Sequence, residues 1–286
     1  LYFHKRVNLG MPAYSEGFRI DFEVCPNIPR LAAALDATVA RHEALRTHFK
    51  NEASYIRQVI EPTLGPILEV EEPLKSISSE LEAAEISRRV IDFIRHPFDL
   101  ERGPLLRAKL FVMHEGGCVL AFANHHAICD AHSRAILLND LQRSYRGASE
   151  FTTPAQFRSF SRRQRSAAIL PQTAKKLKRF KEALDDSPRL RLPFSPPSPI
   201  KSNELAGARV ELVIGRELIQ QVEIAARDLG ATPYMMLVAA WTIVLARSSG
   251  ASEIVVGIPA DARSTDESGM VGFGISVVPI RILVDL

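Results

Sequence analysis

The sequence predicts an α/β protein built from two lobes, and three observations support this prediction. Apolar runs of strand length alternate along the chain with amphipathic helical segments. A proline-rich stretch at residues 192–199 interrupts this alternation, and a similar mixture of helix and strand lies on either side of it. The 286 residues suffice for one large domain or two modest ones. We therefore expect an N-terminal lobe over 1–160, a basic helical and Pro-rich connection over 161–204, and a C-terminal lobe over 205–286.

The first lobe begins with a long amphipathic helix, because apolar residues recur on one face from Leu31 to Phe49. Gly116 and Gly117 are typical of a tight turn between two strands. In chain order, the expected elements are a helix at 28–49, a strand at 54–60, a helix at 79–94, and strands at 106–113 and 118–124.

The connection starts as a basic helical stretch and ends in prolines, which cannot continue a helix because they lack the donor N–H. Its positive face is either simply solvated or a docking surface for an acidic partner. Beyond it, Thr232 is a good N-cap because Pro233 follows at the first helical position. The expected elements of the second lobe are a strand at 208–214, helices at 217–229 and from 232, and strands at 253–259 and 277–284.

Composition excludes several classes of protein. The net charge of +3 is too small to argue for a nucleic-acid partner. No apolar run reaches the roughly 18 residues that a membrane span needs, so no membrane association is expected. The three cysteines show no C-x-x-C spacing and are expected to be reduced thiols, which favours a cytoplasmic location.

The segment 124–131 (Asn-His-His-Ala-Ile-Cys-Asp-Ala) carries the most informative chemistry. It joins an apolar strand to a helical pattern, so His125 and His126 lie where the strand ends and Asp130 lies in the turn that opens the helix. A rigid strand end is a good place to hold a general base. Neighbouring strand residues face opposite ways, so only one of the two histidines can point into a cleft. For the same reason they are poor joint metal ligands, and we expect no metal.

Several motifs in the chain resemble those of one family. The segment 125–131 resembles the HHxxxDG signature of nonribosomal peptide synthetase condensation domains, members of the chloramphenicol acetyltransferase-like superfamily. The segment 41–47 (Arg-His-Glu-Ala-Leu-Arg-Thr) matches the family's RHExLRT element in full, and 97–107 resembles its PFDL…GPLLR element. Later segments, 256–263 and 271–281, resemble two further motifs in the same order.

The resemblance implies two chloramphenicol-acetyltransferase-like lobes in a V arrangement, the second lobe incomplete because the chain stops earlier than such domains normally do. It implies an acyltransferase that forms an amide between two thioesters, each carried on the phosphopantetheine of a carrier protein. The implied partners are upstream and downstream peptidyl carrier proteins and an adjacent adenylation domain of a larger synthetase. No cofactor is expected to bind the domain itself.

The resemblance also assigns roles to residues. The catalytic candidates are His126, His125 and Asp130, with His126 as the base or as the stabiliser of the intermediate. Asp130 either orients His126 or forms an ion pair that holds the turn. We favour the ion pair, because the resemblance pairs this aspartate with an arginine of the RHExLRT element, and we choose Arg41 over Arg46. Asn124, Gly272 and Ser276 are expected to line the substrate tunnel.

Three departures from the family pattern leave alternatives open. Ala131 stands in place of the usual glycine and is expected to tighten the turn. Gly274 and Ser276 stand where an aromatic residue and an asparagine are usual. The early end of the chain is the third departure. A degenerate domain that only docks carrier proteins, an ester-forming relative, and an acyltransferase that uses acyl-coenzyme A are therefore the alternatives.

Overall fold

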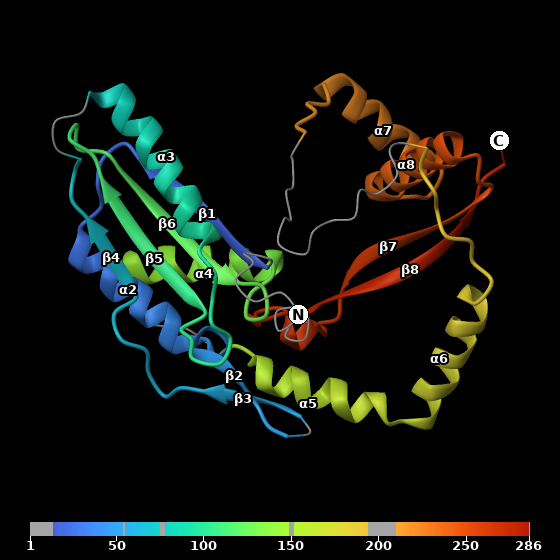
Figure 1. The fold of residues 1–286 in the computed structure, drawn as a ribbon, viewed down its shortest axis with the longest axis horizontal. Helices are drawn as coiled ribbons and strands as arrows, with labels where there is room; N and C mark the ends of the chain where they lie inside the picture. The colour runs from blue at the N-terminus through green and yellow to red at the C-terminus, as the bar shows by residue number, and fades with distance from the viewer. Residues whose placement is uncertain (1–13, 54, 75–77, 149–151, 194–209, 286) are drawn as a thin grey trace. The chain divides into compact units, whose positions relative to one another are not determined.

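The computed structural model describes residues 14–53, 55–74, 78–148, 152–193 and 210–285. The chain forms two compact units (Figure 1). The first comprises 1–167 together with 261–275, and the second comprises 168–260 together with 276–286. The segment 261–275 packs with the first unit, although the sequence pattern placed it in the second lobe. The predicted lobe boundaries are otherwise left as predictions, and residues 194–204 of the predicted connection lie outside the described residues.

The first unit is built around a four-stranded sheet with the order β1-β6-β5-β4. β6 pairs antiparallel with β1 and with β5, and β5 pairs parallel with β4. A separate hairpin pairs β2 with β3. The strands are β1 (Ser15–Phe22), β2 (Thr47–Asn51), β3 (Ile56–Ile60), β4 (Leu68–Glu71), β5 (Leu106–Val112) and β6 (Cys118–His125).

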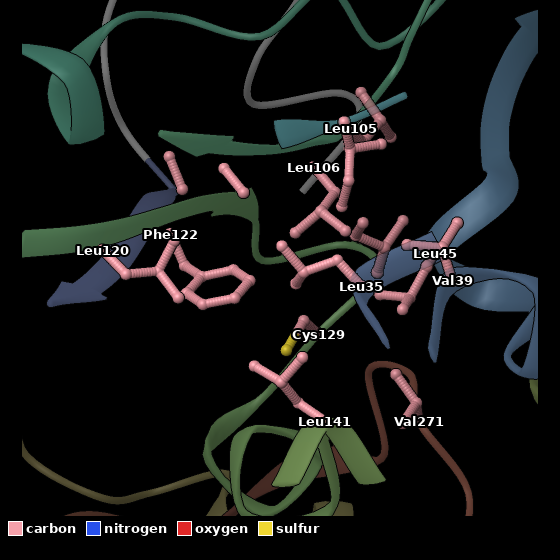
Figure 2. Close-up of a cluster of buried hydrophobic side chains, with 14 of the residues drawn as sticks. Leu35, Val39, Leu45, Leu105, Leu106, Leu120, Phe122, Cys129, Leu141 and Val271 are labelled. Atoms are coloured by element: carbon pink, nitrogen blue, oxygen red, sulfur yellow. The ribbon is translucent and has the colours of Figure 1, made fainter. Parts of the chain in front are cut away.

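Helices cover both faces of this sheet (Figure 1). Alternation along β6 explains why: Leu120 and Phe122 join the core beneath α2 and α4, whereas Val119 and Ala121 pack with residues of α3. Figure 2 shows the larger cluster, in which side chains of α2 lie near Leu105 and Leu106. The helices of this unit are α2 (Ile28–Arg41), α3 (Ser79–Arg95), α4 (Ala131–Tyr145) and α5 (Phe157–Ala168), with 3₁₀ turns at Glu43–Arg46 and Thr265–Glu267.

The second unit contains α6 (Pro171–Leu184), α7 (Arg216–Asp228), α8 (Pro233–Ser249), β7 (Glu253–Asp261) and β8 (Ile275–Leu283). Thr232 caps α8 as predicted, because its Oγ accepts a hydrogen bond from the Met235 N–H at 3.2 Å. Among the described residues no single helix is long and apolar enough to span a membrane, although α7 and α8, bent by 102°, pass together on length and composition.

Two predicted elements are wrong. The helix predicted over 28–49 ends at Arg41, and Thr47–Asn51 is a strand instead. The apolar spacing is broken between Val39 and Leu45, and the β3 strand offers residues 47–51 a complete set of pairing partners. Residues 208 and 209 of the strand predicted over 208–214 lie outside the described residues, and 210–214 are irregular, with Val210 and Val213 more than 90% exposed. No described strand pairs with it.

Candidate active site

The end of β6 delivers two adjacent histidines into very different surroundings. His125 is the last residue of the strand and is fully buried. Its Nδ1 accepts a hydrogen bond from the Ala127 N–H at 3.1 Å, and its ring packs edge-on against Phe98. His126 lies one residue beyond the strand, and 23% of its side chain is exposed. The geometry supports a structural role for His125 and leaves His126 as the histidine that can meet a substrate.

His126 is held so that one ring nitrogen is committed and the other is available. Nδ1 lies 2.7 Å from the carbonyl oxygen of Cys129, which only accepts hydrogen bonds, so Nδ1 carries the proton. Nε2 has no hydrogen-bond partner within the described residues. The neutral ring therefore presents a lone pair at Nε2, which is what a general base needs.

The thiol of Cys129 offers no competing chemistry. Burial raises its pKa to about 12, so it stays protonated near neutral pH. Cys129 contributes to the site through its backbone carbonyl, which orients His126. The three cysteines of the chain are free thiols, and no cluster of metal-ligating side chains occurs within the part of the chain that the structure describes.

Asp130 is the N-cap residue that precedes α4, and its side chain is completely buried. Its carboxylate accepts hydrogen bonds from the Ser133 N–H at 2.9 Å, the Ser133 hydroxyl at 2.7 Å and the Gly274 N–H at 2.9 Å. Arg263 adds its Nη2 at 2.9 Å from Oδ2. In the described part of the chain neither oxygen is bonded to His126, so Asp130 is not the partner of the base.

The predicted ion pair between Arg41 and Asp130 is therefore wrong. Asp130 does form an ion pair, but its partner is Arg263, which sequence reasoning did not select. Arg41 instead places its Nε 2.8 Å from Oδ2 of Asp140, and His42 contributes Nε2 to the same oxygen at 2.9 Å. The reason is positional: Asp130 caps the start of α4, whereas α2 packs alongside the helix nearer the buried Asp140.

The Asp130 cluster fixes the segment 272–274 next to the base. The carbonyl of Gly272 accepts from Arg263 Nη2 at 2.9 Å, and the Gly272 N–H donates to the Ser133 hydroxyl oxygen at 3.0 Å. Phe273, between the two glycines, packs edge-on against the ring of His126 with centroids 5.0 Å apart. Gly272 has φ of 153°, and a Cβ there would lie 2.3 Å from the ring of Phe157, so only glycine fits.

The remaining predicted site residues are spread over both units. Asn124 is buried on β6, and its Nδ2 has no hydrogen-bond partner among the described residues. Ala131 is the exposed first residue of α4. Ser276 is exposed on β8 in the second unit. The tunnel-lining role of Asn124, Gly272 and Ser276, and the effect of Ala131 on the turn, stay predictions.

Sequence reasoning missed Glu16, Phe273 and Arg263. Glu16 lies on β1 opposite Asn124, and its Oε2 is 3.5 Å from His126 Nδ1. The alternation of Phe18, Ile20 and Phe22 could have revealed this strand. Arg263 belongs to a segment that was matched to the family, but no spacing rule connects it with a residue 133 positions earlier.

This fold and site are those of acyltransferases of the chloramphenicol acetyltransferase type, with a histidine one residue beyond a central strand and a buried aspartate four residues later. The family model for the condensation domain matches residues 1–285, and the chain belongs to this family. Condensation domains are acyltransferases that form amide bonds.

Two synthetases illustrate the relationship. The chain is 31% identical over 259 residues to the chondramide synthase cmdD of Chondromyces crocatus, in a match that covers 88% of this chain and 6% of the relative. It is 31% identical over 258 residues to gramicidin S synthase 2 of Aneurinibacillus migulanus, with coverage of 88% and 6%. The chain thus spans a small part of the length of these relatives.

A solved structure supports the fold. The first condensation domain of the calcium-dependent antibiotic synthetase, in complex with a substrate analogue, superposes with a TM-score of 0.80 at 19% identity. The match covers 99% of this chain and 66% of that chain. The predicted acetyltransferase-like fold is confirmed by this likeness.

Proposed function

We propose that this chain joins a donor acyl or peptidyl thioester to an acceptor aminoacyl thioester, both carried by peptidyl carrier proteins, as one domain of a larger synthetase. The observation that carries the proposal is the orientation of His126, whose Nδ1 is committed to the Cys129 carbonyl while Nε2 is left for the substrate. The relatives are synthetases many times longer than this chain, which supports carrier proteins and an adjacent adenylation domain as partners. The reaction needs no cofactor on this chain, and its proposed place is the cytoplasm.

The chemistry follows from the available nitrogen. The acceptor amine attacks the donor thioester carbonyl, forming a C–N bond, and Nε2 of His126 takes the proton that the nitrogen must lose. The C–S bond then breaks, and the leaving thiolate receives that proton. Overall, a thioester and an amine become an amide and a thiol, and His126 is regenerated.

Proximity contributes a large share of the rate. Holding two tethered reactants in register removes about 7–11 kcal/mol of barrier, whereas base catalysis typically supplies about 10²–10⁴-fold. Loss of His126 is therefore expected to slow the reaction strongly while leaving a measurable residue of activity.

The test is to load donor and acceptor analogues onto two carrier proteins and to follow the condensed product by mass spectrometry. We expect product from the native chain and a rate lower by about 100-fold or more in His126→Ala. His96→Ala, which removes an exposed histidine from the end of α3, is the matched control and should retain the native rate.

The alternatives give different results in the same assay. Carrier binding without any product would favour a domain that only docks. Product formed from a hydroxy acceptor in place of an amine would identify an ester-forming relative. Turnover of acyl-coenzyme A without a carrier protein would point to a coenzyme A-dependent acyltransferase.

A further inference from the structure

A second carboxylate, distinct from Asp130, lies beside the candidate base. Glu16 occupies the second position of β1, directly opposite Asn124 of β6. Its Oε2 is 3.5 Å from Nδ1 of His126, and its side chain is 28% exposed. It is the nearest acidic group to this imidazole among the contacts of the described residues.

Arg134 fixes the position of this carboxylate. Its Nη2 donates to Oε2 of Glu16, the same oxygen that approaches His126. Arg134 lies in the first turn of α4, where its backbone N–H donates to the Asp130 carbonyl. Glu16 is thus held between a guanidinium from α4 and an imidazole from the end of β6, so two rigid elements set its distance from the ring.

The two acceptors near Nδ1 have different roles. The Cys129 carbonyl is closer, at 2.7 Å, and fixes the tautomer of the neutral ring. A carboxylate 3.5 Å away adds little to that choice, but it bears a full negative charge. Such a charge interacts most strongly with the ring when the ring is positive.

We propose that Glu16, held by Arg134, is a positioning residue that stabilises the imidazolium of His126 after Nε2 has taken the acceptor's proton. This inference rests on the proposed function and assigns the supporting carboxylate to β1 instead of the signature motif. Asp130 cannot serve, because its oxygens are occupied by Ser133, Gly274 and Arg263. The signature aspartate thus builds the site, and Glu16 supports the base.

Glu16→Gln tests the charge, because glutamine keeps the shape and an acceptor oxygen. We expect kcat to fall about tenfold, a part of the 10²–10⁴ that a positioned base supplies, with KM for the carrier-bound substrates changed less than about twofold. Glu16→Asp, which keeps the charge, should retain more of kcat than Glu16→Gln. Asp21→Asn removes another carboxylate of β1, one paired with the exposed Arg19, and should leave kcat unchanged.

A second measurement needs no turnover. In protein labelled with ¹⁵N-histidine, the His126 resonances are assigned with His126→Ala and recorded at one fixed pH near neutrality. We expect Nδ1 to show the shift of a protonated ring nitrogen, and we expect the His126 resonances to move in Glu16→Gln but not in Asp21→Asn. Thermal melts that match the native protein show that each variant is folded.

The outcomes separate the inference from the proposed function. Unchanged His126 resonances in Glu16→Gln, or a kcat within about twofold of native, would overturn the role of Glu16. If the His126 resonances move in Glu16→Gln but the native chain makes no amide, the contact between Glu16 and His126 is supported and the proposed reaction is overturned instead.

Discussion

Arg263 and Asp130 form a buried ion pair, with Nη2 2.9 Å from Oδ2 and side-chain exposures of 2% and 0%. Burial alone would raise the pKa of Asp130, but hydrogen bonds from Ser133 and Gly274 and the charge of Arg263 hold it below its usual value. The carboxylate therefore stays charged and keeps the segment around Phe273 against His126.

Removing Arg263 should destabilise the folded protein. In Arg263→Met the buried carboxylate loses its counter-charge, and we expect the free energy of unfolding to fall by about 3–5 kcal/mol in urea titrations. Arg88→Met removes an exposed arginine that pairs with Glu85 and Asp92, and it should cost far less. Equal losses in the two variants would contradict the structural role of Arg263.

Gly274 tests how tightly this cluster is packed. A Cβ at this position would lie 2.4 Å from Nη1 of Arg263, whose guanidinium is already bonded to Asp130 and Gly272. We expect Gly274→Ala to destabilise the protein by about 1–3 kcal/mol and to slow condensation, because Phe273 must shift with its neighbour. Gly65→Ala introduces a methyl group into open space and is the control. Unfolding midpoints that match between the two variants would show that the guanidinium yields freely.

Glu267 should make the free energy of unfolding depend on pH in the acidic range. The hydrogen bond from Arg163, followed by those from Ser264, holds the pKa of Glu267 at about 2. This pKa is below the ordinary glutamate value of about 4.3. The contribution of Glu267 to the free energy of unfolding is therefore complete above about pH 4.3 and is lost as the pH falls toward about 2. We expect the stability difference between the native protein and Glu267→Gln to be largest near about pH 6 and to shrink by about pH 3. A difference that stays constant over this range would contradict the assignment.

Asp140 should support the fold without touching the chemistry. Arg41 and His42 share its Oδ2, and the side chain of Asp140 is almost fully buried. We expect Asp140→Asn to lower the free energy of unfolding by about 1.5–3 kcal/mol, while the kcat of the folded fraction stays native. The exposed neighbour Asn139, changed to Ala, is the control. A loss of kcat at full stability would instead link Arg41 to the reacting groups.

Local patterns predicted the local parts of the site. The apolar run before His125 and the helical spacing after Asp130 correctly predicted a strand, a turn and a helix. The helix cap at Thr232 was predicted equally well, because a capping side chain bonds to a backbone group only three residues away. Each of these features depends on neighbours in the chain.

Long-range partners could not be predicted in the same way. Arg41, Arg46 and Arg263 are chemically equivalent candidates for Asp130, and only the packing of α2 and of the segment 261–275 selects between them. Phe49 is the one apolar residue among residues 47–51, so this segment has no clear pattern of its own, and its pairing with the distant strand β3 makes it a strand. The role of Glu16 was missed for the same reason, because its position beside His126 results from the pairing of β1 with β6, which places it opposite Asn124.

The assignment of 261–275 to the first unit affects how this domain can be divided. The polypeptide passes from one unit to the other three times, so no single cut separates them. A fragment that ends at residue 167 would contain both histidines of the signature and yet leave the Asp130 carboxylate without Arg263. The residues that build the site are therefore discontinuous in sequence. A fragment that carries the signature but lacks 261–275 also lacks the arginine that pairs with Asp130.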